Sequence, residues 1–258
     1  MAARFITTAP CALCALLAVA PLPLHAACTA TSGATTAAVV ELYTSEGCSS
    51  CPPADKWLSS LKDPAVVALA MHVDYWDYLG WRDRFSSAQF SQRQAQSVRR
   101  SNGRVAYTPQ VLVDGRDFRQ WRSSDAFQRA VRAVSARPAQ ARIELSANQV
   151  QPQTWSVTFK GNMTRRQGSA VAYLALYENG LKTGVGAGEN RGATLHHDRV
   201  VRTWLGPVRV DADRPVRMDL QLKPSEAIDY ARAGVAALIE DGDSGEILQA
   251  LDMALCRS

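Results

Sequence analysis

The sequence has little cysteine, no long apolar run beyond its N-terminus and no excess of charge of one sign. Its 258 residues include six cysteines, with 29 Lys or Arg against 24 Asp or Glu and a formal net charge of +5. Basic runs such as Arg99-Arg100 are short, so we expect a mildly basic surface and no nucleic-acid partner. No later segment approaches the about 20 apolar residues of a spanning helix, so we expect no stable membrane insertion.

Residues 1–27 have the three parts of a secretory signal peptide. Arg4 supplies a positive charge, an apolar stretch follows, and His25-Ala26-Ala27 forms a small-residue exit. We therefore predict a periplasmic or secreted protein. Lipid anchoring at Cys28 is the alternative that the sequence favours less, because His25 stands where lipoprotein signals usually carry Leu.

Removal of the signal peptide leaves four cysteines, namely Cys28, Cys48, Cys51 and Cys256. An even number in an exported chain indicates disulfides. Of the three possible pairings, Cys48 with Cys51 is the local one, which leaves Cys28 with Cys256. This second bridge would join the two ends of the mature chain and stabilise the fold by about 4 to 5 kcal/mol.

The chain up to residue 138 alternates strand and helix patterns. Apolar, β-branched runs predict strands, and prolines or serines mark helix starts. The predicted order is a strand at 38–44, a helix from Pro52-Pro53, a strand ending near Tyr75, a helix from Ser86 or Ser87 to Asn102-Gly103, a hairpin turning at Asp114-Gly115, and a helix ending before Pro138. After this point apolar residues recur with period two, which predicts strands packed as a β-sandwich.

Cys48-Ser49-Ser50-Cys51 lies between the first predicted strand and the first predicted helix. The spacing suits a redox pair, a zinc clip or a small structural disulfide. For a redox pair we expect the turn to expose Cys48, the helix N-terminus to favour its thiolate, and Cys51 to act as resolving thiol. Zinc needs a second pair of ligands, and Cys28 and Cys256 are isolated, so we predict no metal.

Together with Thr108-Pro109 at the start of the hairpin, this motif resembles the active site of the thioredoxin superfamily over residues 37–137. The resemblance implies that Thr108 and Pro109, with a cis peptide bond, face Cys48 and Cys51. It also implies that Glu41 lies near where thioredoxins bury a proton-accepting carboxylate, with a raised pKa and a role in proton transfer. The alternative is a structural glutamate satisfied by an arginine or a backbone amide.

Four strings across the mature chain are similar to a family of exported bacterial proteins of unknown function with a thioredoxin-like domain: GCSSCPPAD, HVDYWDYLGW, YTPQVLVDG and GENRG. The chain departs from thioredoxins in Gly47, where they have tryptophan, and in the Ser-Ser dipeptide. The predicted fold class is an α/β thioredoxin-like domain at 28–138, with a helical insertion at about 77–103, followed by a mostly β, sandwich-like domain at 141–258.

These features predict a thiol-disulfide oxidoreductase in which Cys48 attacks and Cys51 resolves. Its partners would be protein or small-molecule thiols and disulfides, and it would need no cofactor. The alternative is a non-catalytic binding module, for a peptide or a soft metal such as Cu(I), in which Cys48–Cys51 is a structural disulfide. No Ser-His-Asp or phosphate-loop pattern points to another class of enzyme.

Overall fold

The fold is mostly β. The structure, a computed structural model, describes residues 27–164, 168–211, 214–223 and 228–256, so the predicted signal peptide, apart from Ala27, lies outside it. The described residues form fourteen strands and three α-helices, α1 (Pro52–Ser60), α2 (Ala88–Arg100) and α3 (Ser124–Ser135), with short 3-10 helices η1 (Asp77–Leu79) and η2 (Tyr230–Arg232). None of these helices has the length and apolar character needed to cross a membrane.

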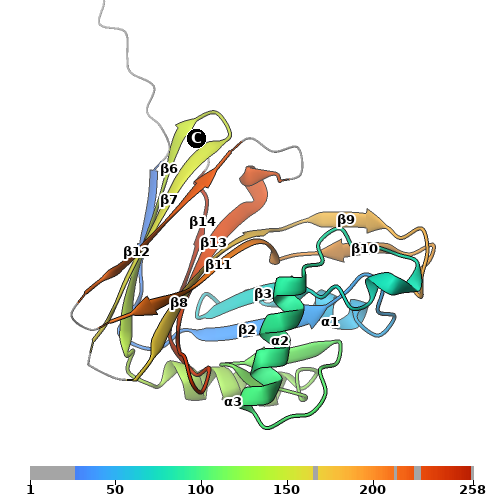
Figure 1. Cartoon of the computed structure of the whole chain (residues 1–258), viewed down its shortest axis with the longest axis horizontal. Helices are drawn as coiled ribbons and strands as arrows, with labels where there is room; N and C mark the ends of the chain where they lie inside the picture. The colour runs from blue at the N-terminus through green and yellow to red at the C-terminus, as the bar shows by residue number, and fades with distance from the viewer. Residues whose placement is uncertain (1–26, 165–167, 212–213, 224–227, 257–258) are drawn as a thin grey trace, which may run out of the picture.

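The strands form three sheets (Figure 1). The largest has eight strands in the order β14 (Ile247–Ala254), β13 (Ala233–Asp241), β8 (Ala170–Glu178), β11 (Val200–Val210), β3 (Val66–His72), β2 (Ala38–Thr44), β4 (Gln110–Val113) and β5 (Arg116–Asp117). The second has four strands in the order β1 (Ala27–Thr31), β6 (Ala141–Gln151), β7 (Thr154–Met163) and β12 (Val216–Leu222). The third pairs β9 (Leu181–Gly184) with β10 (Thr194–His197).

The predicted fold class is wrong, because strands from both parts of the chain share one sheet. β11 pairs with β3 in parallel, with Val200 opposite Ala70, and β8, β13 and β14 extend the sheet from there. An α/β thioredoxin-like domain followed by a separate β domain is therefore not formed. Local periodicity identifies strands but does not reveal which strands pair across the chain. The division at residues 138–141 itself stays a prediction.

The individual elements around the cysteines agree well with the sequence. β2 spans the predicted residues 38–44, and α1 begins at Pro52. Ser87 caps α2 by accepting a hydrogen bond from the Gln89 amide, and Ser123 caps α3 in the same way. Such caps satisfy amides that have no partner inside the helix, which is why serine at these positions predicts a helix start.

Successive side chains of β2 point to opposite faces of the long sheet. Val40 and Leu42 pack in a core with α1 and α3, whereas Val39 and Tyr43 pack in another core with Phe90 of α2. This alternation follows from the period of two in a strand. The cysteines at the start of α1 therefore belong to the face that the even-numbered residues of β2 cover.

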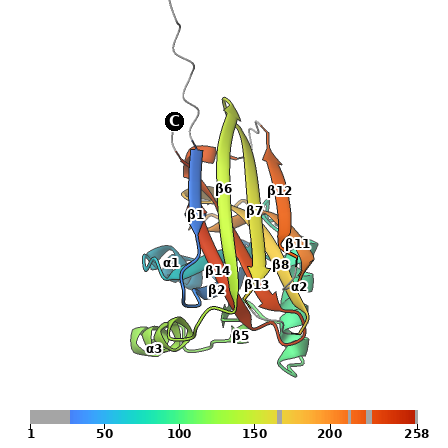
Figure 2. The ribbon, with the colours of Figure 1, turned by 90° about the vertical axis from the view of Figure 1, so that its left-hand side faces the viewer.

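A third core lies between the four-stranded sheet and the β8, β13 and β14 part of the long sheet. Figure 2 shows β1, β6, β7 and β12 in front of these strands. Ile143 and Phe159 meet Leu174, Val235 and Ile239 there, and all five are buried. The space between the two facing sheets buries the alternating apolar residues of these strands.

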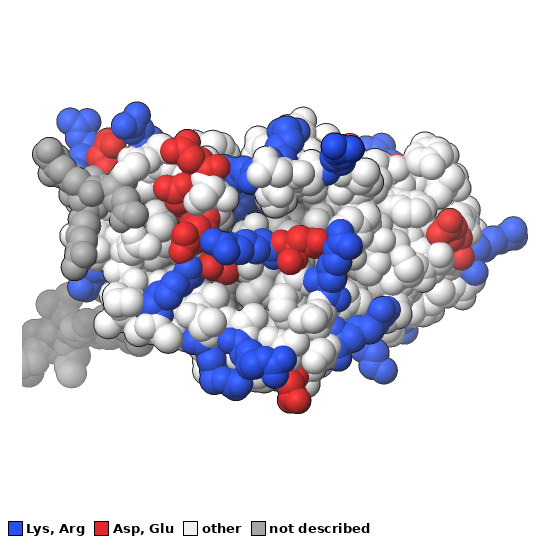
Figure 3. Space-filling view, turned by 90° about the horizontal axis from the view of Figure 1, so that it is seen from below, with Lys and Arg blue, Asp and Glu red and all other residues white. Residues whose placement is uncertain are grey.

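The predicted disulfide between Cys28 and Cys256 is present. It joins β1 to the segment after β14, at a sequence separation of 228. On the face shown in Figure 3, basic and acidic side chains are interspersed and neither sign covers the surface. Among the ion pairs of the chain, Arg137 pairs with both Asp114 and Glu246.

Candidate functional site

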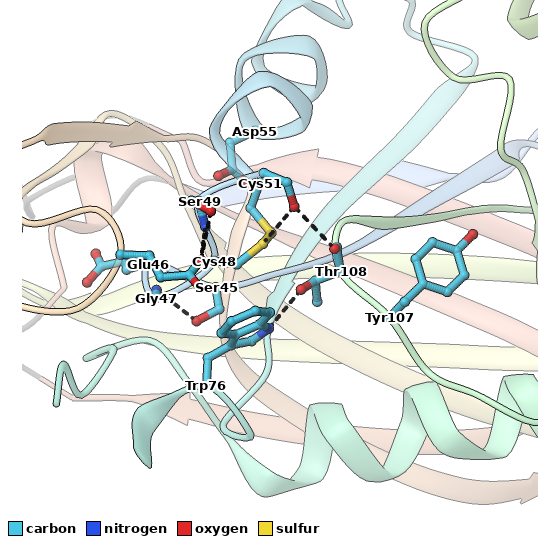
Figure 4. Close-up of a disulfide and its surroundings, with 12 residues drawn as sticks. Ser45, Glu46, Gly47, Cys48, Ser49, Cys51, Asp55, Trp76, Tyr107 and Thr108 are labelled. Carbon is cyan, nitrogen blue, oxygen red and sulfur yellow. Dashed lines mark hydrogen bonds between the residues drawn. A yellow bond between two sulfur atoms is a disulfide. The ribbon is translucent and has the colours of Figure 1, made fainter. Parts of the chain in front are cut away.

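A second disulfide joins Cys48 to Cys51 in the connection between β2 and α1 (Figure 4). Their Cα atoms are 5.4 Å apart, and the Cys51 amide donates to the Cys48 carbonyl at 3.2 Å. Cys51 immediately precedes Pro52, the first residue of α1. The predicted local pairing is therefore confirmed, and the motif lies at a strand-to-helix junction as expected.

The first amides of α1 do not provide the predicted stabilisation of a Cys48 thiolate. Pro52 and Pro53 have no N–H, and the amides of Ala54 and Asp55 both donate to the Cys51 carbonyl, at 2.8 and 3.2 Å. The Ser50 hydroxyl instead lies 3.4 Å from Cys48 Sγ. A side-chain hydroxyl, rather than these helix amides, is thus available to the sulfur.

The prediction that the turn exposes Cys48 is wrong. Cys48 and Cys51 each have 0% of their surface accessible, whereas Ser49 and Ser50 between them are exposed. A Cβ on Gly47 would approach the Trp76 side chain to 3.1 Å, so Trp76 packs closely on the loop before Cys48. The sulfur atoms lie one layer below the surface.

Thr108 lies across from the cysteines, as the resemblance to thioredoxins implies, and its peptide bond to Pro109 is cis. Ser50 Oγ is 3.5 Å from the Thr108 carbonyl oxygen. The Trp76 indole N–H donates to Thr108 Oγ1 at 2.8 Å. The structure thus brings Cys48, Cys51, Thr108 and Pro109 into one neighbourhood.

A surface pocket of about 330 Å³ adjoins this neighbourhood. It is lined by Tyr107, Pro109, Val111, Arg119 and Trp121. Its walls are mainly apolar, and the Arg119 guanidinium is the charged group among them.

The loop between β9 and β10, residues 185–193, covers the turn that carries the cysteines. The side-chain amide of Asn190 donates through Nδ2 to the backbone carbonyls of Glu46 and Cys48, at 2.9 and 3.0 Å. The Glu189 carboxylate accepts from the Ser49 amide at 3.1 Å and from the Ser49 hydroxyl at 2.7 Å. This loop contains the GENRG string, for which the sequence offered no role.

Glu41 lies on the opposite face of the sheet. Arg93 of α2 donates to both of its carboxylate oxygens, at 2.8 and 2.7 Å, and the Tyr43 hydroxyl donates at 2.7 Å. Burial raises the pKa of Glu41, but Arg93 and Tyr43 together lower it by more, so this pKa lies below its ordinary value. The predicted raised pKa is wrong, because odd-numbered residues of β2 point away from α1. The contacts match the structural alternative instead.

Five ionisable side chains form a buried cluster on the cysteine side, which we call the histidine–carboxylate cluster: Glu46, Asp55, His72, Asp83 and His197. Asp83 Oδ2 lies 2.6 Å from His72 Nδ1. His197 lies between two carboxylates, with Nε2 3.6 Å from Glu46 and Nδ1 3.8 Å from Asp55. The two imidazole rings meet edge to face with centroids 4.9 Å apart.

Many polar atoms of this cluster and its surroundings have no hydrogen-bond partner in the described part of the chain. They are Thr44 Oγ1, Glu46 Oε1, Asp55 Oδ1, His72 Nε2, Thr183 Oγ1 and both ring nitrogens of His197. Unpaired polar groups are costly in a protein interior, and native proteins keep them mostly where water or chemistry uses them. The cluster is therefore a candidate part of the site.

The pKa shifts within the cluster have opposite directions. Burial raises the pKa of Asp55 more than His197 and His72 lower it. Burial lowers the pKa of His72, but Asp83, Asp55 and Glu46 together raise it by more, so this pKa lies above its ordinary value. The same pairing with His72 holds the pKa of Asp83 low despite burial.

None of the five residues of this cluster was predicted from the sequence as a site residue. Asp55 could have been found, because it follows Cys51 by four residues and such pairs share one face of a helix. His196 and His197 are adjacent on β10 and point to opposite faces, since His196 is exposed and His197 is buried. No group of three or more His, Cys, Asp or Glu side chains in the described residues is arranged to hold a metal ion.

Comparison with known proteins gives neighbours in structure. Protein AGR_C_4864 from Agrobacterium tumefaciens is 26% identical, with a TM-score of 0.60 over 87% of this chain and 96% of its own. HBP35 of Porphyromonas gingivalis is 16% identical, with a TM-score of 0.63 over 87% of this chain and 76% of its own. The second likeness concerns the fold alone. No curated protein sequence is significantly similar.

A family model matches residues 39–240, which include the cysteine motif, the histidine–carboxylate cluster and the β9–β10 loop. Its description is "Protein of unknown function (DUF1223)". The matched region covers most of the described residues, and we conclude that this chain belongs to the DUF1223 family.

Proposed function

We propose that this protein exchanges thiols and disulfides through Cys48 and Cys51 in a periplasmic or secreted setting. The observation that carries the proposal is the disulfide of two-residue spacing between β2 and α1, with the Thr108 carbonyl across from it and Ser50 between them. This local unit is similar to the thioredoxin active site in its residues. The likeness concerns the unit and does not extend to the fold.

The reaction needs no cofactor. A client thiolate attacks Cys48 Sγ, a client–Cys48 disulfide forms, and the Cys48–Cys51 bond breaks as Cys51 takes up a proton. A second client thiolate then displaces Cys48, which leaves as a thiol. Two client thiols thereby become one disulfide, and the protein's disulfide becomes two thiols. The reverse sequence reduces a client.

A purely structural role explains this disulfide less well. The chain-entropy model gives about 2 kcal/mol for a ring as short as Cys48–Cys51, against about 5 kcal/mol for the ring closed by Cys28–Cys256, given sequence separations of 3 and 228. The Cys28–Cys256 bridge is therefore the one that contributes more to the stability of the fold. The short bridge lies among buried ionisable groups, which cluster at functional sites.

Exchange requires the cover over Cys48 to open. Asn190 and Glu189 hold the turn through four hydrogen bonds. At a net contribution of about 0.5 to 1.5 kcal/mol each, releasing them costs about 2 to 6 kcal/mol. Local openings in this range are well within those of native proteins. The buried sulfur is thus compatible with slow, controlled exchange.

Proton transfer at Cys51 belongs, in this proposal, to Asp55. Cys51 and Asp55 are both buried and are spaced by four residues at the start of α1, so their side chains lie on one face. The raised pKa of Asp55 allows its carboxyl to hold a proton that a departing Cys51 thiolate needs.

The test is capture of a client. In a Cys51→Ala variant the free Cys48 should attack a disulfide-bonded client and keep it as a mixed disulfide that a reductant releases. Cys48→Ala is the matched control and should capture nothing. If Cys51→Ala forms no mixed disulfide with proteins of a periplasmic extract, with native insulin or with glutathione disulfide, the proposal fails.

The complete burial of both cysteines favours a second candidate, a binding module with a structural Cys48–Cys51 disulfide. This protein would bind a peptide, or a soft metal such as Cu(I) after reduction. Thiol titration distinguishes the two: an inert disulfide under mild reductant supports the binding module, as would stoichiometric copper in purified protein without exchange.

A further inference from the structure

Glu189 is the charged group of the β9–β10 loop that touches the cysteine turn. Its carboxylate accepts two hydrogen bonds from Ser49, the residue after Cys48, and the side chain is exposed. These hydrogen bonds lower the pKa of Glu189, so the carboxylate stays ionised at neutral pH. A negative charge therefore sits at the surface beside the buried sulfur.

We propose that Glu189 is a specificity-determining residue, which favours thiols that carry a cationic group over thiols with additional negative charge. This inference rests on the proposed exchange at Cys48. The attacking sulfur must pass the exposed Ser49–Ser50 side of the turn, because the opposite side of the cysteines is the interior. Any charge on the incoming molecule is then brought close to the Glu189 carboxylate.

Other charges near the turn do not provide the same effect. Glu46, Asp55 and Asp83 are buried with the two histidines of the cluster. Arg191, the next charged residue of the loop, and Lys56 of α1 are also exposed, but in the described residues neither side chain hydrogen-bonds to the cysteine turn. Glu189 differs in being bonded directly to the residue beside Cys48.

The alternative role for Glu189 is purely structural, in which its hydrogen bonds to Ser49 hold the turn closed and its charge has no effect. Two variants separate these roles. Glu189→Gln keeps a side-chain oxygen that can accept from Ser49 and removes the charge. Asn190→Ala removes the two hydrogen bonds to the Glu46 and Cys48 carbonyls and leaves the charge in place. Loss of a purely structural contact changes the reaction rates of all thiols by the same factor, whereas loss of the charge changes the ratio of the rates of cationic and anionic thiols.

The experiment measures how fast full-length, signal-free protein loses the Cys48–Cys51 disulfide to three thiols that differ by one unit charge each: cysteamine, 2-mercaptoethanol and 2-mercaptoethanesulfonate. Samples are acid-quenched and alkylated, and mass spectrometry of peptides reports Cys48 and Cys51 separately from Cys28 and Cys256. The chemistry is the exchange written above, in which two thiols become one disulfide.

In Glu189→Gln at low salt, we expect the cysteamine-to-mercaptoethanesulfonate rate ratio to fall about four- to tenfold relative to wild type. The change should shrink at 1 M salt, which screens charge. Asn190→Ala should raise all three rates by a similar factor. A reactive disulfide whose rate ratio is the same in wild type and Glu189→Gln overturns the selectivity alone. A disulfide inert to all three thiols in every protein overturns the proposed function as well.

Discussion

At the scale of single residues, two buried carboxylates near the motif differ in role because they face opposite sides of one sheet. Glu41 is neutralised by Arg93, which also contacts Glu240 at 2.9 Å. Asp55 instead lies beside His197, and its Oδ1 atom has no partner in the described residues. The first arrangement is a buried ion pair, and the second holds the carboxyl that we propose as a proton donor.

Replacing each carboxylate by its amide tests this difference. Asp55→Asn should change the pH profile of thiol exchange, because the variant lacks the carboxyl that we propose as the proton donor to Cys51. Glu41→Gln should leave that profile unchanged and lower the free energy of unfolding by about 3 kcal/mol at neutral pH, because Arg93 loses a buried partner. Stopped-flow exchange and urea unfolding measure the two effects.

The stability effect of Glu41→Gln should itself depend on pH. The pKa of Glu41 is lower in the folded protein than its ordinary value. Its contribution is therefore present above the pKa of the unfolded chain and is lost as the pH falls through the folded value. The unfolding free energies of Glu41→Gln and wild type should converge in acid.

For Asp55, a pH profile of thiol exchange in Asp55→Asn identical to that of wild type would remove this residue from the mechanism.

At the scale of elements, two turns join the parts of the long sheet that come from different halves of the chain. Gly115, in the β4–β5 turn, has φ +73°, and a Cβ there would lie 2.2 Å from the Gly245 carbonyl oxygen in the β13–β14 turn. Arg137, after α3, pairs with Asp114 and Glu246 at the same junction. The close approach of the two turns thus requires a residue without a side chain.

Gly115→Ala should lower the free energy of unfolding by about 2 to 4 kcal/mol, because its Cβ meets backbone and its φ is positive. Gly33→Ala is the matched control, since a Cβ at Gly33 meets nothing within 4 Å. Urea unfolding followed by circular dichroism compares them. Equal stability of the two variants would mean that the turns separate at little cost.

At the scale of the whole molecule, the Cys28–Cys256 bridge connects β1 to the segment after β14, while the Cys48–Cys51 bridge closes only a short turn. In the chain-entropy model, long rings restrict the unfolded chain more. Their contributions to stability should therefore differ, even though both are cystines in one protein.

The double variant Cys28→Ser, Cys256→Ser should lose about 5 kcal/mol of unfolding free energy and keep thiol exchange at Cys48. The double variant Cys48→Ser, Cys51→Ser should lose about 2 kcal/mol and all exchange. Urea unfolding under oxidising conditions and the exchange assay provide the measurements. A larger stability loss from the Cys48–Cys51 pair would favour the structural alternative.

Local signals in the sequence determined most elements of the cysteine region and both disulfide pairings. The bounds of β2, the start of α1 at Pro52 and the serine caps of α2 and α3 depend on residues close in the chain. The pairings followed from the number and spacing of four cysteines. The position of Thr108-Pro109 opposite the motif came from a resemblance carried by residues within one unit.

Only the tertiary structure decided which strands share a sheet, which face each carboxylate occupies, and what covers Cys48. The pairing of β11 with β3 and the hydrogen bonds from Asn190 and Glu189 join residues more than 100 positions apart, and no local pattern specifies such contacts. The burial of Cys48 and the histidine–carboxylate cluster follow from them. Sequence periodicity reports how each segment buries its own face, whereas the partner for that face is chosen by the packing of the whole chain.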